Sequence, residues 1–386
     1  MRRLPWEYAV RNLGRSPVRL ALTVAGSALV VLLVFAAAAF VRGLGANLAV
    51  SGSERNVILL GAGSEESLER SEIPPTVDGI VAASVPGLKT RLGVPYLSPE
   101  VHLAALLKTR PDEDHAHLGM LRGVRPAAFL VHPRVRIVEG RLPGPNELLV
   151  GRLAGVRMGL RDEELALGRT LWFDNRAWTV CGRFEAPGTV MEGEIWCDLA
   201  ELQIAARRDN LSCVVATLDT ATFEDLDLFA RQRLDLELVA IRETAYYGQL
   251  LKFYRPIEIV VWVTALLIAL GGLLGGLNTL YAAFAARVRE LGALQTLGYS
   301  RLALVLSMVQ ESVLATAAGA LLAALPAVLL LDGVAVRFSM GVFGLIVDGP
   351  VMALGLGAGL LLGVLGTLPP AWRCLRLEIA TALRSA

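Results

Sequence analysis

Cysteine, aromatic residues and net charge are all scarce in this sequence. Four cysteines occur among 386 residues, aromatic residues make up 6%, and the formal net charge is +1. No cysteine lies in a C-x-x-C or Cys/His spacing, so the pattern predicts neither a metal site nor a redox site. The small net charge argues against a general attraction to nucleic acid. The sequence also has no G-x-x-x-x-G-K-(S/T) loop, so it predicts no nucleotide site in this chain.

Long hydrophobic runs are what the sequence has instead. Hydrophobic residues make up 54% of the chain and are concentrated in four segments. Crossing the hydrocarbon core of a bilayer takes roughly 20 apolar residues, and we expect membrane helices at 20–42, 256–286, 302–331 and 349–370. The first apolar run is longer than the about 7–15 residues of a signal peptide, which favours a retained anchor. The fourth stops at Pro369-Pro370, where two prolines are expected to end or sharply bend a helix.

Arginines are distributed unevenly over the connections between these helices. They lie in the leader 1–19, in the connection 287–301 and in the tail 371–386, which share one side if the chain crosses four times. The short connection 332–348 has no positive excess. Because cytoplasmic segments are enriched in Lys and Arg, we expect both termini in the cytoplasm and residues 43–255 outside it.

Residues 43–255 are numerous enough for one or two small folded domains. Strand patterns occur at 56–60, 146–151 and 212–218, and a hairpin over 170–180 is expected to turn at Asp174-Asn175. Residues 223–234 have helical spacing. We therefore predict four transmembrane helices with an α+β extracytoplasmic domain inserted between the first and second helices. Residues 242–255 are expected to continue as a helix into the second crossing.

Cysteine and histidine in this domain leave two alternatives open. Cys181, Cys197 and Cys213 could supply one disulfide in an oxidising compartment, or could be small buried residues. His115 and His117, beside acidic residues, fit either a weak metal site or a solvated acidic loop. No Ser/His/Asp or paired-carboxylate arrangement stands out between residues 42 and 255, so the sequence gives no support to an active site there.

The connection after the second crossing holds the most informative motif. A polar turn is followed by a short amphipathic element, and Gly298 is a candidate C-cap. Such an element fits a rigid knob that docks into a groove of a partner, or a plain loop anchored by arginines at lipid headgroups. The residues by themselves leave both readings open. The candidate docking residues are Arg287, Arg289, Glu290, Leu291, Gly292, Leu294, Leu297 and Gly298.

The stretch 287–298 resembles the signature R-x-R-E-(I/L)-G-x-L-(R/K)-(A/T)-(I/L)-G of FtsX-like permeases, the membrane subunits of MacB/LolE-type ABC transporters. It departs from that pattern at Gln295, where the family usually has Arg or Lys. The leader resembles the family's N-terminal amphipathic helix. The phrases at 139–143 and 146–151 resemble the MacB-like periplasmic core domain, and 370–373 with 382–384 resembles the family's ending, although Glu378 stands where Pro is common.

This resemblance implies a non-catalytic permease subunit in a bacterial inner membrane, with both termini cytoplasmic. It implies that the chain itself binds no cofactor or metal, and that ATP-Mg binds to a separate cytoplasmic ABC ATPase subunit that docks at 287–298. A second permease copy, in a homodimer or a related heterodimer, and membrane lipids are further implied partners. A periplasmic adaptor is another candidate, and nucleic acid is not expected.

The implied mechanism is mechanotransmission. ATP hydrolysis in the partner would move the extracytoplasmic domain, for export or extraction of a hydrophobic or amphiphilic substrate. The alternative from another functional class is an FtsX-like signalling subunit that controls a cell-wall hydrolase or a sensor.

Two features within the crossings are further candidates. Glu311 is the only ionised group well inside a predicted membrane helix, where an unpaired acid costs roughly 2.5–3.5 kcal/mol. We expect it to face a helix interface, either protonated or bonded to a Ser or Thr. Small residues spaced four apart favour close helix contacts, and they predict a dimer seam on the second helix. Its residues are Gly271, Gly272, Gly275 and Gly276.

Overall fold

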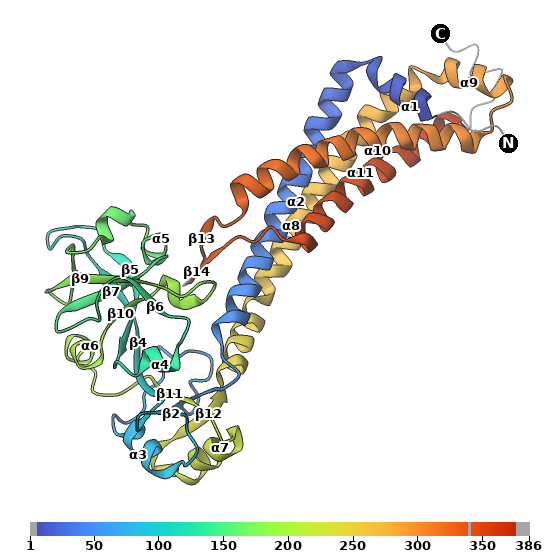
Figure 1. Ribbon diagram of the computed structural model, residues 1–386. Helices are drawn as coiled ribbons and strands as arrows, with labels where there is room; N and C mark the ends of the chain where they lie inside the picture. The colour runs from blue at the N-terminus through green and yellow to red at the C-terminus, as the bar shows by residue number, and fades with distance from the viewer. Residues whose placement is uncertain (1–5, 339–340, 376–386) are drawn as a thin grey trace. The chain divides into compact units, whose positions relative to one another are not determined.

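The computed structural model describes residues 6–338 and 341–375, without the side chain of Trp6. The arginines of 1–5 and 376–386, on which the predicted orientation partly depends, lie outside the described residues. The chain divides into two compact units. The helical unit lies within residues 1–42, 256–334 and 345–386, and the α/β unit comprises 43–255 and 335–344. The predicted fold class, four apolar helices with a mixed domain between the first two, is confirmed (Figure 1).

Four helical segments are long and apolar enough to cross a membrane. They are α2 (Pro17–Ser51), α8 (Glu243–Ala285), α10 (Arg301–Pro326) with the π-helical turn Ala327–Leu331, and α11 (Gly349–Leu375). Two short helices accompany them, α1 (Trp6–Gly14) and α9 (Val288–Thr296). The long helices run side by side in Figure 1, and α10 and α11 pack against each other along their lengths.

Glycines allow the membrane helices to approach closely, and two of these contacts involve α2. A Cβ on Gly319 of α10 would lie 2.5 Å from the carbonyl oxygen of Val24 in α2, and one on Gly355 of α11 would lie 2.2 Å from the ring of Phe35. Real Cβ atoms do not come this close to other atoms. Van der Waals packing of small residues is a main source of helix association in lipid, so these two contacts fix α2 against α10 and α11.

The helix α11 does not end at its two prolines, which corrects the expectation from the sequence. It continues through Pro369 and Pro370 to Leu375. The last turn is held by burial, because Ala371 and Leu375 are at most 2% exposed and belong to an apolar cluster with Phe284 of α8. This packing offsets the backbone hydrogen bond that a proline removes from a helix interior.

The helices α2 and α8 extend beyond the length that a bilayer requires. Their 35 and 43 residues correspond to about 52 Å and 65 Å at 1.5 Å per residue, against about 30 Å of hydrocarbon. The helical continuation that the sequence predicted for 242–255 is confirmed, because α8 begins at Glu243 and is unbroken to Ala285. Both helices therefore carry the chain from one unit into the other without an intervening loop.

The α/β unit is built on a ten-stranded mixed sheet in the order β12-β1-β11-β4-β5-β10-β7-β9-β6, with β8 paired to β9. The strands are β1 (Asn56–Gly61), β4 (Leu97–Leu107), β5 (His117–Val124), β6 (Arg136–Gly140), β7 (Glu147–Gly151), β8 (Thr170–Phe173), β9 (Arg176–Glu185), β10 (Ile195–Asp198), β11 (Cys213–Thr217) and β12 (Leu238–Arg242). A separate pair is formed by β2 (Thr90–Arg91) and β3 (Val94–Pro95).

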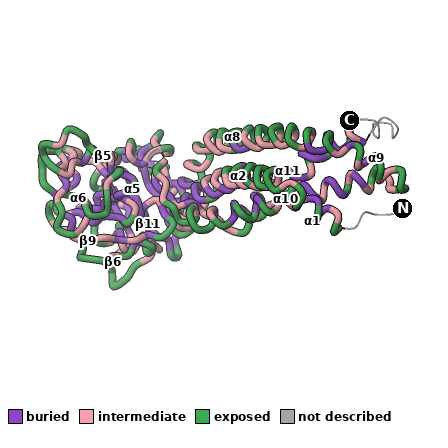
Figure 2. Tube along the Cα trace, turned by 90° about the horizontal axis from the view of Figure 1, so that it is seen from above, coloured by how far each residue is buried: buried purple, intermediate pink, exposed green. Residues whose placement is uncertain are grey.

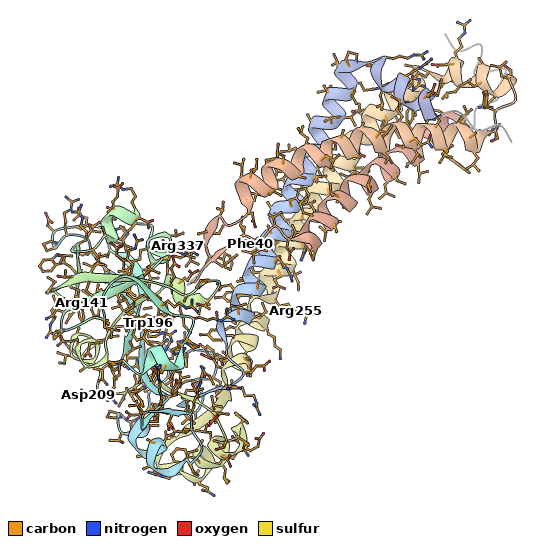
Figure 3. All side chains as sticks on the ribbon, in the orientation of Figure 1. Phe40, Arg141, Trp196, Asp209, Arg255 and Arg337 are labelled. Carbon is orange, nitrogen blue, oxygen red and sulfur yellow. The ribbon has the colours of Figure 1, made fainter. Side chains whose placement is uncertain are left out.

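The long strand β4 joins two parts of this sheet. Its residues 97–100 pair with β11, and its residues 101–107 pair with β5. The helices of the unit are α3 (Val77–Ser84), α4 (Ala128–Val131), α5 (Ala154–Met158), α6 (Leu199–Ala206) and α7 (Phe223–Gln232), with short 3-10 turns at Asp162–Leu165, Val190–Gly193 and Leu234–Leu236. Figure 2 shows many buried residues in the interior of the α/β unit. Trp196, labelled in Figure 3, is one of its fully buried side chains.

Local patterns in the sequence predicted several of these elements. The strands at 56–60 and 212–218 and the helix at 223–234 correspond to β1, β11 and α7. The hairpin of β8 and β9 turns at Asp174 and Asn175, whose φ angles are +47° and +57°. Positive φ at both central residues is the type I′ geometry that two-residue hairpins prefer, and Asp and Asn tolerate it better than most residues.

The connection 332–348, predicted only as a short loop, contains a two-stranded hairpin. Its strands are β13 (Ala335–Phe338) and β14 (Gly341–Gly344), and they belong to the α/β unit. The hairpin packs on α5 and on the turn Val190–Gly193, where the side chain of Val342 covers Gly193. Arg337 of β13 is labelled in Figure 3. The α/β unit is thus connected to the helical unit through α2, through α8 and through this hairpin.

The cysteines of the described residues are free thiols, so the disulfide alternative is not what the structure shows. Cys197 and Cys213 are fully buried, as the alternative of small buried residues expected. Of the two histidines near the acidic loop, His117 has both ring nitrogens engaged. One lies 3.1 Å from Glu113 and the other 3.0 Å from the carbonyl oxygen of Met158.

Candidate functional site

The candidate site is the connection between α8 and α10, in which α9 is a separate two-turn helix. It follows Arg287 and spans Val288–Thr296. Gly298 has a φ of +89°, and the amides of Gly298 and Tyr299 donate to the carbonyl oxygens of Gln295 and Leu294. This is the left-handed C-terminal cap that the sequence predicted at Gly298. A rigid turn therefore separates α9 from α10.

One face of α9 is packed within the helical unit. Val288, Leu291 and Gly292 are buried, and Leu291 joins the apolar cluster that contains Phe284 and Leu375. Two predicted docking residues, Leu291 and Gly292, thus have no side-chain surface available to a partner. Their burial instead holds α9 against α8 and α11.

The opposite face of α9 is exposed. Arg289, Ala293, Thr296 and Leu297 lie at helical spacing and are exposed, with Leu297 at 66%. Of the eight predicted docking residues, Arg289, Leu297 and Gly298 are therefore exposed, and Leu294 is half-buried. We call Arg289, Ala293, Thr296 and Leu297 the outer face of α9.

Glu311 lies in the first half of α10, at the centre of a polar cluster. It is only 7% exposed, and its carboxylate pairs with Arg287 at 3.0 Å and with Arg19 at 3.1 Å. The side-chain amide of Asn12 donates to it as well. We expected Glu311 to be protonated or to bond a Ser or Thr. In the structure its partners are instead two arginines and the side-chain amide of an asparagine. Sequence reasoning did not find this arrangement, because Arg19 and Asn12 are almost 300 positions from Glu311 in the chain.

Glu290 extends this cluster to the surface. Its carboxylate accepts hydrogen bonds from the Tyr8 hydroxyl at 2.8 Å and from Arg15 at 2.9 Å, and Arg287 lies 3.5 Å away. Burial raises the pKa of the Glu290 carboxyl, but the bonds from Tyr8 and Arg15 outweigh it, so the pKa is lowered overall. Burial, together with the bond to Glu290, raises the pKa of Tyr8. Glu290 is therefore engaged within the chain, and its side chain is 35% exposed.

These groups form what we call the coupling cluster, defined as Tyr8, Asn12, Arg15, Arg19, Arg287, Glu290 and Glu311. The cluster ties α1, the start of α2, α9 and α10 together. Removing one partner of a buried ion pair is strongly destabilising because it leaves an uncompensated charge. These buried polar contacts therefore hold the four segments to one another. A cavity of about 20 Å³ borders Arg19 and Glu311, which is enough space for one water molecule.

The glycines of the predicted dimer seam divide into two groups. A Cβ on Gly271, Gly275 or Gly276 would meet nothing within 4 Å, whereas one on Gly272 would lie 2.5 Å from the side chain of Val30 in α2. Only 6% of the most apolar window of α8 is buried, against 33–39% for the other three long helices. The face of α8 that carries Gly271 and Gly275 is thus open within this chain.

These observations define a class of protein: a multi-pass membrane protein with a large α/β unit between its first two helices and an ion-paired connecting helix between its second and third. Residues 262–379 match the family model described as FtsX-like permease C-terminal. The predicted resemblance to FtsX-like permeases is therefore confirmed, on a stretch that includes α9, α10 and α11. None of the curated proteins matches the chain.

Two solved structures are similar to this chain at low sequence identity. One is the periplasmic region of MacB from Actinobacillus actinomycetemcomitans, 10% identical, with a TM-score of 0.39, covering 54% of this chain and 97% of that chain. The other is the extracellular domain of the noncanonic ABC-type transporter YknZ from Gram-positive bacteria, 11% identical, with a TM-score of 0.37, covering 48% of this chain and 99% of that chain.

Proposed function

We propose that this chain is the permease subunit of an ABC-type transporter and that a separate ATPase subunit drives it through the outer face of α9. The match of residues 262–379 to FtsX-like permeases carries the proposal. In this proposal both termini and α9 are cytoplasmic, the α/β unit is extracytoplasmic, and ATP-Mg binds to the partner chain.

The geometry of α9 supports a docking role. A helix that receives force from a partner needs an accessible face and a rigid support behind it. The outer face of α9 offers Arg289 and Leu297, a cation and an apolar side chain at the spacing of a helix laid into a groove. Behind it, the coupling cluster and the burial of Leu291 hold α9 against the bundle.

The continuity of α2 and α8 supports mechanical transmission. Both helices leave the helical unit and enter the α/β unit without a break, at the junctions 42–43 and 255–256. An α-helix keeps its length because its backbone bonds are satisfied internally. Force applied at α9 would therefore reach the α/β unit along these helices and through the β13–β14 hairpin. The substrate would be a hydrophobic or amphiphilic molecule exported or extracted outside the cytoplasm.

The exposed α8 supports assembly with a second permease copy. Small residues let helix backbones approach closely in lipid, and the open face with Gly271 and Gly275 offers such a contact. In this proposal two copies, identical or related, meet along α8 and two ATPase subunits bind below them.

The direct test reverses one charge on the outer face of α9 and measures how much ATPase co-purifies with the permease. Arg289→Glu is exposed and is not part of the coupling cluster, so the permease should reach the membrane at normal levels. We expect co-purification of an ABC-type ATPase, identified by its nucleotide-binding loop, to fall at least about tenfold, which corresponds to about 1.4 kcal/mol.

Arg176→Glu is the matched control, because Arg176 is an exposed arginine of the β8–β9 hairpin. It should leave capture and stimulated ATP hydrolysis unchanged. Equal capture by Arg289→Glu and the wild type would refute docking at this face. A partner that turned out to be a cell-wall hydrolase or a sensor, with no transport, would favour the signalling alternative.

A further inference from the structure

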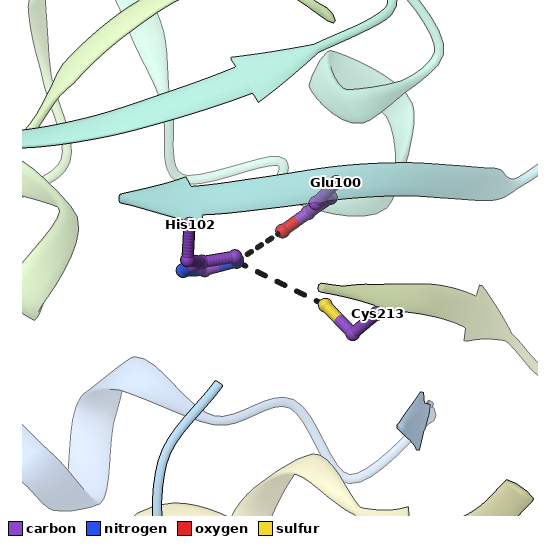
Figure 4. Close-up of side chains that lie close together, drawn as sticks. All are labelled: Glu100, His102 and Cys213. Atoms are coloured by element: carbon purple, nitrogen blue, oxygen red, sulfur yellow. Dashed lines mark hydrogen bonds and ion pairs between the residues drawn. The ribbon is translucent and has the colours of Figure 1, made fainter. Parts of the chain in front are cut away.

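A buried group of potential metal ligands lies in the α/β unit, far along the chain from the coupling cluster. Glu100 and His102 come from β4 and Cys213 comes from β11. Their exposed fractions are 0%, 5% and 0%. One ligand atom from each lies within 4.8 Å of the others, and Figure 4 shows the three side chains converging.

The sheet places these three side chains on one face. Cys213 is the direct cross-strand partner of Glu100, and directly opposite residues point to the same side. His102 follows Glu100 by two positions, and alternate residues of a strand share a face. The bonds from the Ser212 amide to the Glu100 carbonyl and from the His102 amide to the Ser212 hydroxyl, 2.8 Å and 2.9 Å, fix the two backbones locally.

The distances suit a small metal ion. His102 Nε2 lies 3.0 Å from Glu100 Oε2 and 3.9 Å from Cys213 Sγ. Tetrahedral zinc binds nitrogen and oxygen at about 2.0–2.2 Å and sulfur at about 2.3 Å, which separates neighbouring ligand atoms by about 3.3–3.6 Å. The two measured separations, 3.0 Å and 3.9 Å, lie on either side of this range, and the third, between the Glu100 carboxylate and Cys213 Sγ, is at most 4.8 Å.

The surroundings orient Glu100 as the environment of a metal ligand does. Its Oε1 accepts from Ser98 at 2.9 Å and pairs with His132 at 2.8 Å, and Arg122 donates to Oε2 at 2.9 Å. Such outer partners hold a ligand in place and tune its basicity. Oε2 accepts two hydrogen bonds, one from Arg122 and one from His102. A bound metal would replace the hydrogen bond from His102.

The cluster has further contacts with a buried arginine. The guanidinium of Arg122 donates hydrogen bonds to two buried carboxylates, those of Glu194 and Glu100. The thiol of Cys213 contacts His102 Nε2 at 3.9 Å.

We propose that Glu100, His102 and Cys213 form a binding site for a divalent transition metal of the zinc type. Thiolate, imidazole and carboxylate together suit zinc better than magnesium or calcium, which prefer oxygen alone. Binding removes the proton from the Cys213 thiol and moves the imidazole proton to Nδ1, so one proton leaves the site. Three protein ligands leave one zinc position for water.

The place of the site gives it a structural consequence. Glu100 is the last residue of β4 that pairs with β11, and Val101 is the first that pairs with β5. A metal bound here would tie β11 to β4 at the junction between the two parts of the sheet. Metal binding then stabilises the α/β unit by mass action.

The test is the metal content of the full-length chain purified in detergent after zinc loading and dialysis against a weak chelator. We expect about one zinc per chain in the wild type, and at least about a tenfold lower content in Cys213→Ala. Cys197→Ala is the matched control, because Cys197 is an equally buried free thiol of the same sheet that is not part of the ligand group. It should retain the metal.

A second measurement covers the case in which Cys213→Ala does not fold. Cobalt substituted into the wild type should give the charge-transfer absorption of a thiolate–cobalt bond, and this absorption should persist in Cys197→Ala. A wild type that retains no zinc, or cobalt absorption without a thiolate band, overturns the proposal. Equal zinc in the wild type and folded Cys213→Ala overturns it too, because the metal would then lie elsewhere.

Discussion

The coupling cluster makes one strong prediction, for the substitution Glu311→Gln. The change keeps the size of the side chain and removes the charge that Arg19 and Arg287 share. The exposed fractions of the three side chains are 10% for Glu311, 23% for Arg19 and 14% for Arg287. After the substitution Arg19 and Arg287 would lose the carboxylate that they share in a largely dry environment, and Glu290, 3.5 Å from Arg287, would be the acidic partner that remains in the cluster.

The magnitude follows from the burial. Removing one partner of a buried ion pair costs about 3–5 kcal/mol. Because Arg19 keeps some access to water, we expect the lower end, about 3 kcal/mol. The helical unit has a size at which about 1 kcal/mol shifts the melting temperature by about 2–4 °C, so the shift should be about 6–12 °C downward.

The assay is thermal unfolding of the purified chain in detergent, followed by the helical circular dichroism signal. Glu7→Gln is the matched control, since Glu7 is an acid of α1 whose side chain is 80% exposed, and such surface changes are usually within about 0.5 kcal/mol. A double-mutant cycle with Arg19→Gln should give a coupling energy of about 1–3 kcal/mol. An unchanged melting temperature for Glu311→Gln, or a coupling energy of zero, would refute the ion-pair reasoning.

The remaining predictions concern the packing of the membrane helices. Gly275→Leu places its side chain on the open face of α8, so it should abolish cross-linking between permease copies while the monomer melts normally. Gly272→Leu collides with Val30 and should instead lower the melting temperature of the chain. Identical behaviour of the two variants would contradict the proposed seam. Gly319→Val should destabilise the helical unit by about 1–3 kcal/mol, because its Cβ would overlap the Ser27 hydroxyl of α2. The thermal assay described for Glu311 measures this, and a Gly319→Val chain as stable as the wild type would show that α2 and α10 are not in close contact.

Much of the architecture was predictable because its causes are local. A membrane helix is specified by a run of apolar residues, and the four runs matched α2, α8, α10 and α11. Gly298 and the pair Asp174-Asn175 were predicted for the same reason, since a residue that tolerates positive φ marks a cap or a turn wherever it occurs. The site of α9 likewise followed from a short motif.

What the sequence could not provide depends on contacts between distant segments. Glu311 was recognised as an unusual acid, but its partners Arg19 and Asn12 are brought to it only by the packing of α1 and α2 on α10. The extension of α11 past Pro370 needed the buried environment of Leu375. A local rule about proline cannot include that burial.

The same distinction applies to the α/β unit. Sequence reasoning did not group Cys213 with Glu100 and His102, because Cys213 is 111 positions from His102 and no ligand spacing joins them. Only strand register makes Glu100 and Cys213 neighbours, and register is set by the pairing of whole strands through the hydrophobic pattern of the sheet. By itself the sequence determined which segments enter the membrane and which fold outside it. The tertiary structure decided which charges meet, since long-range pairing depends on the packing of all the elements together.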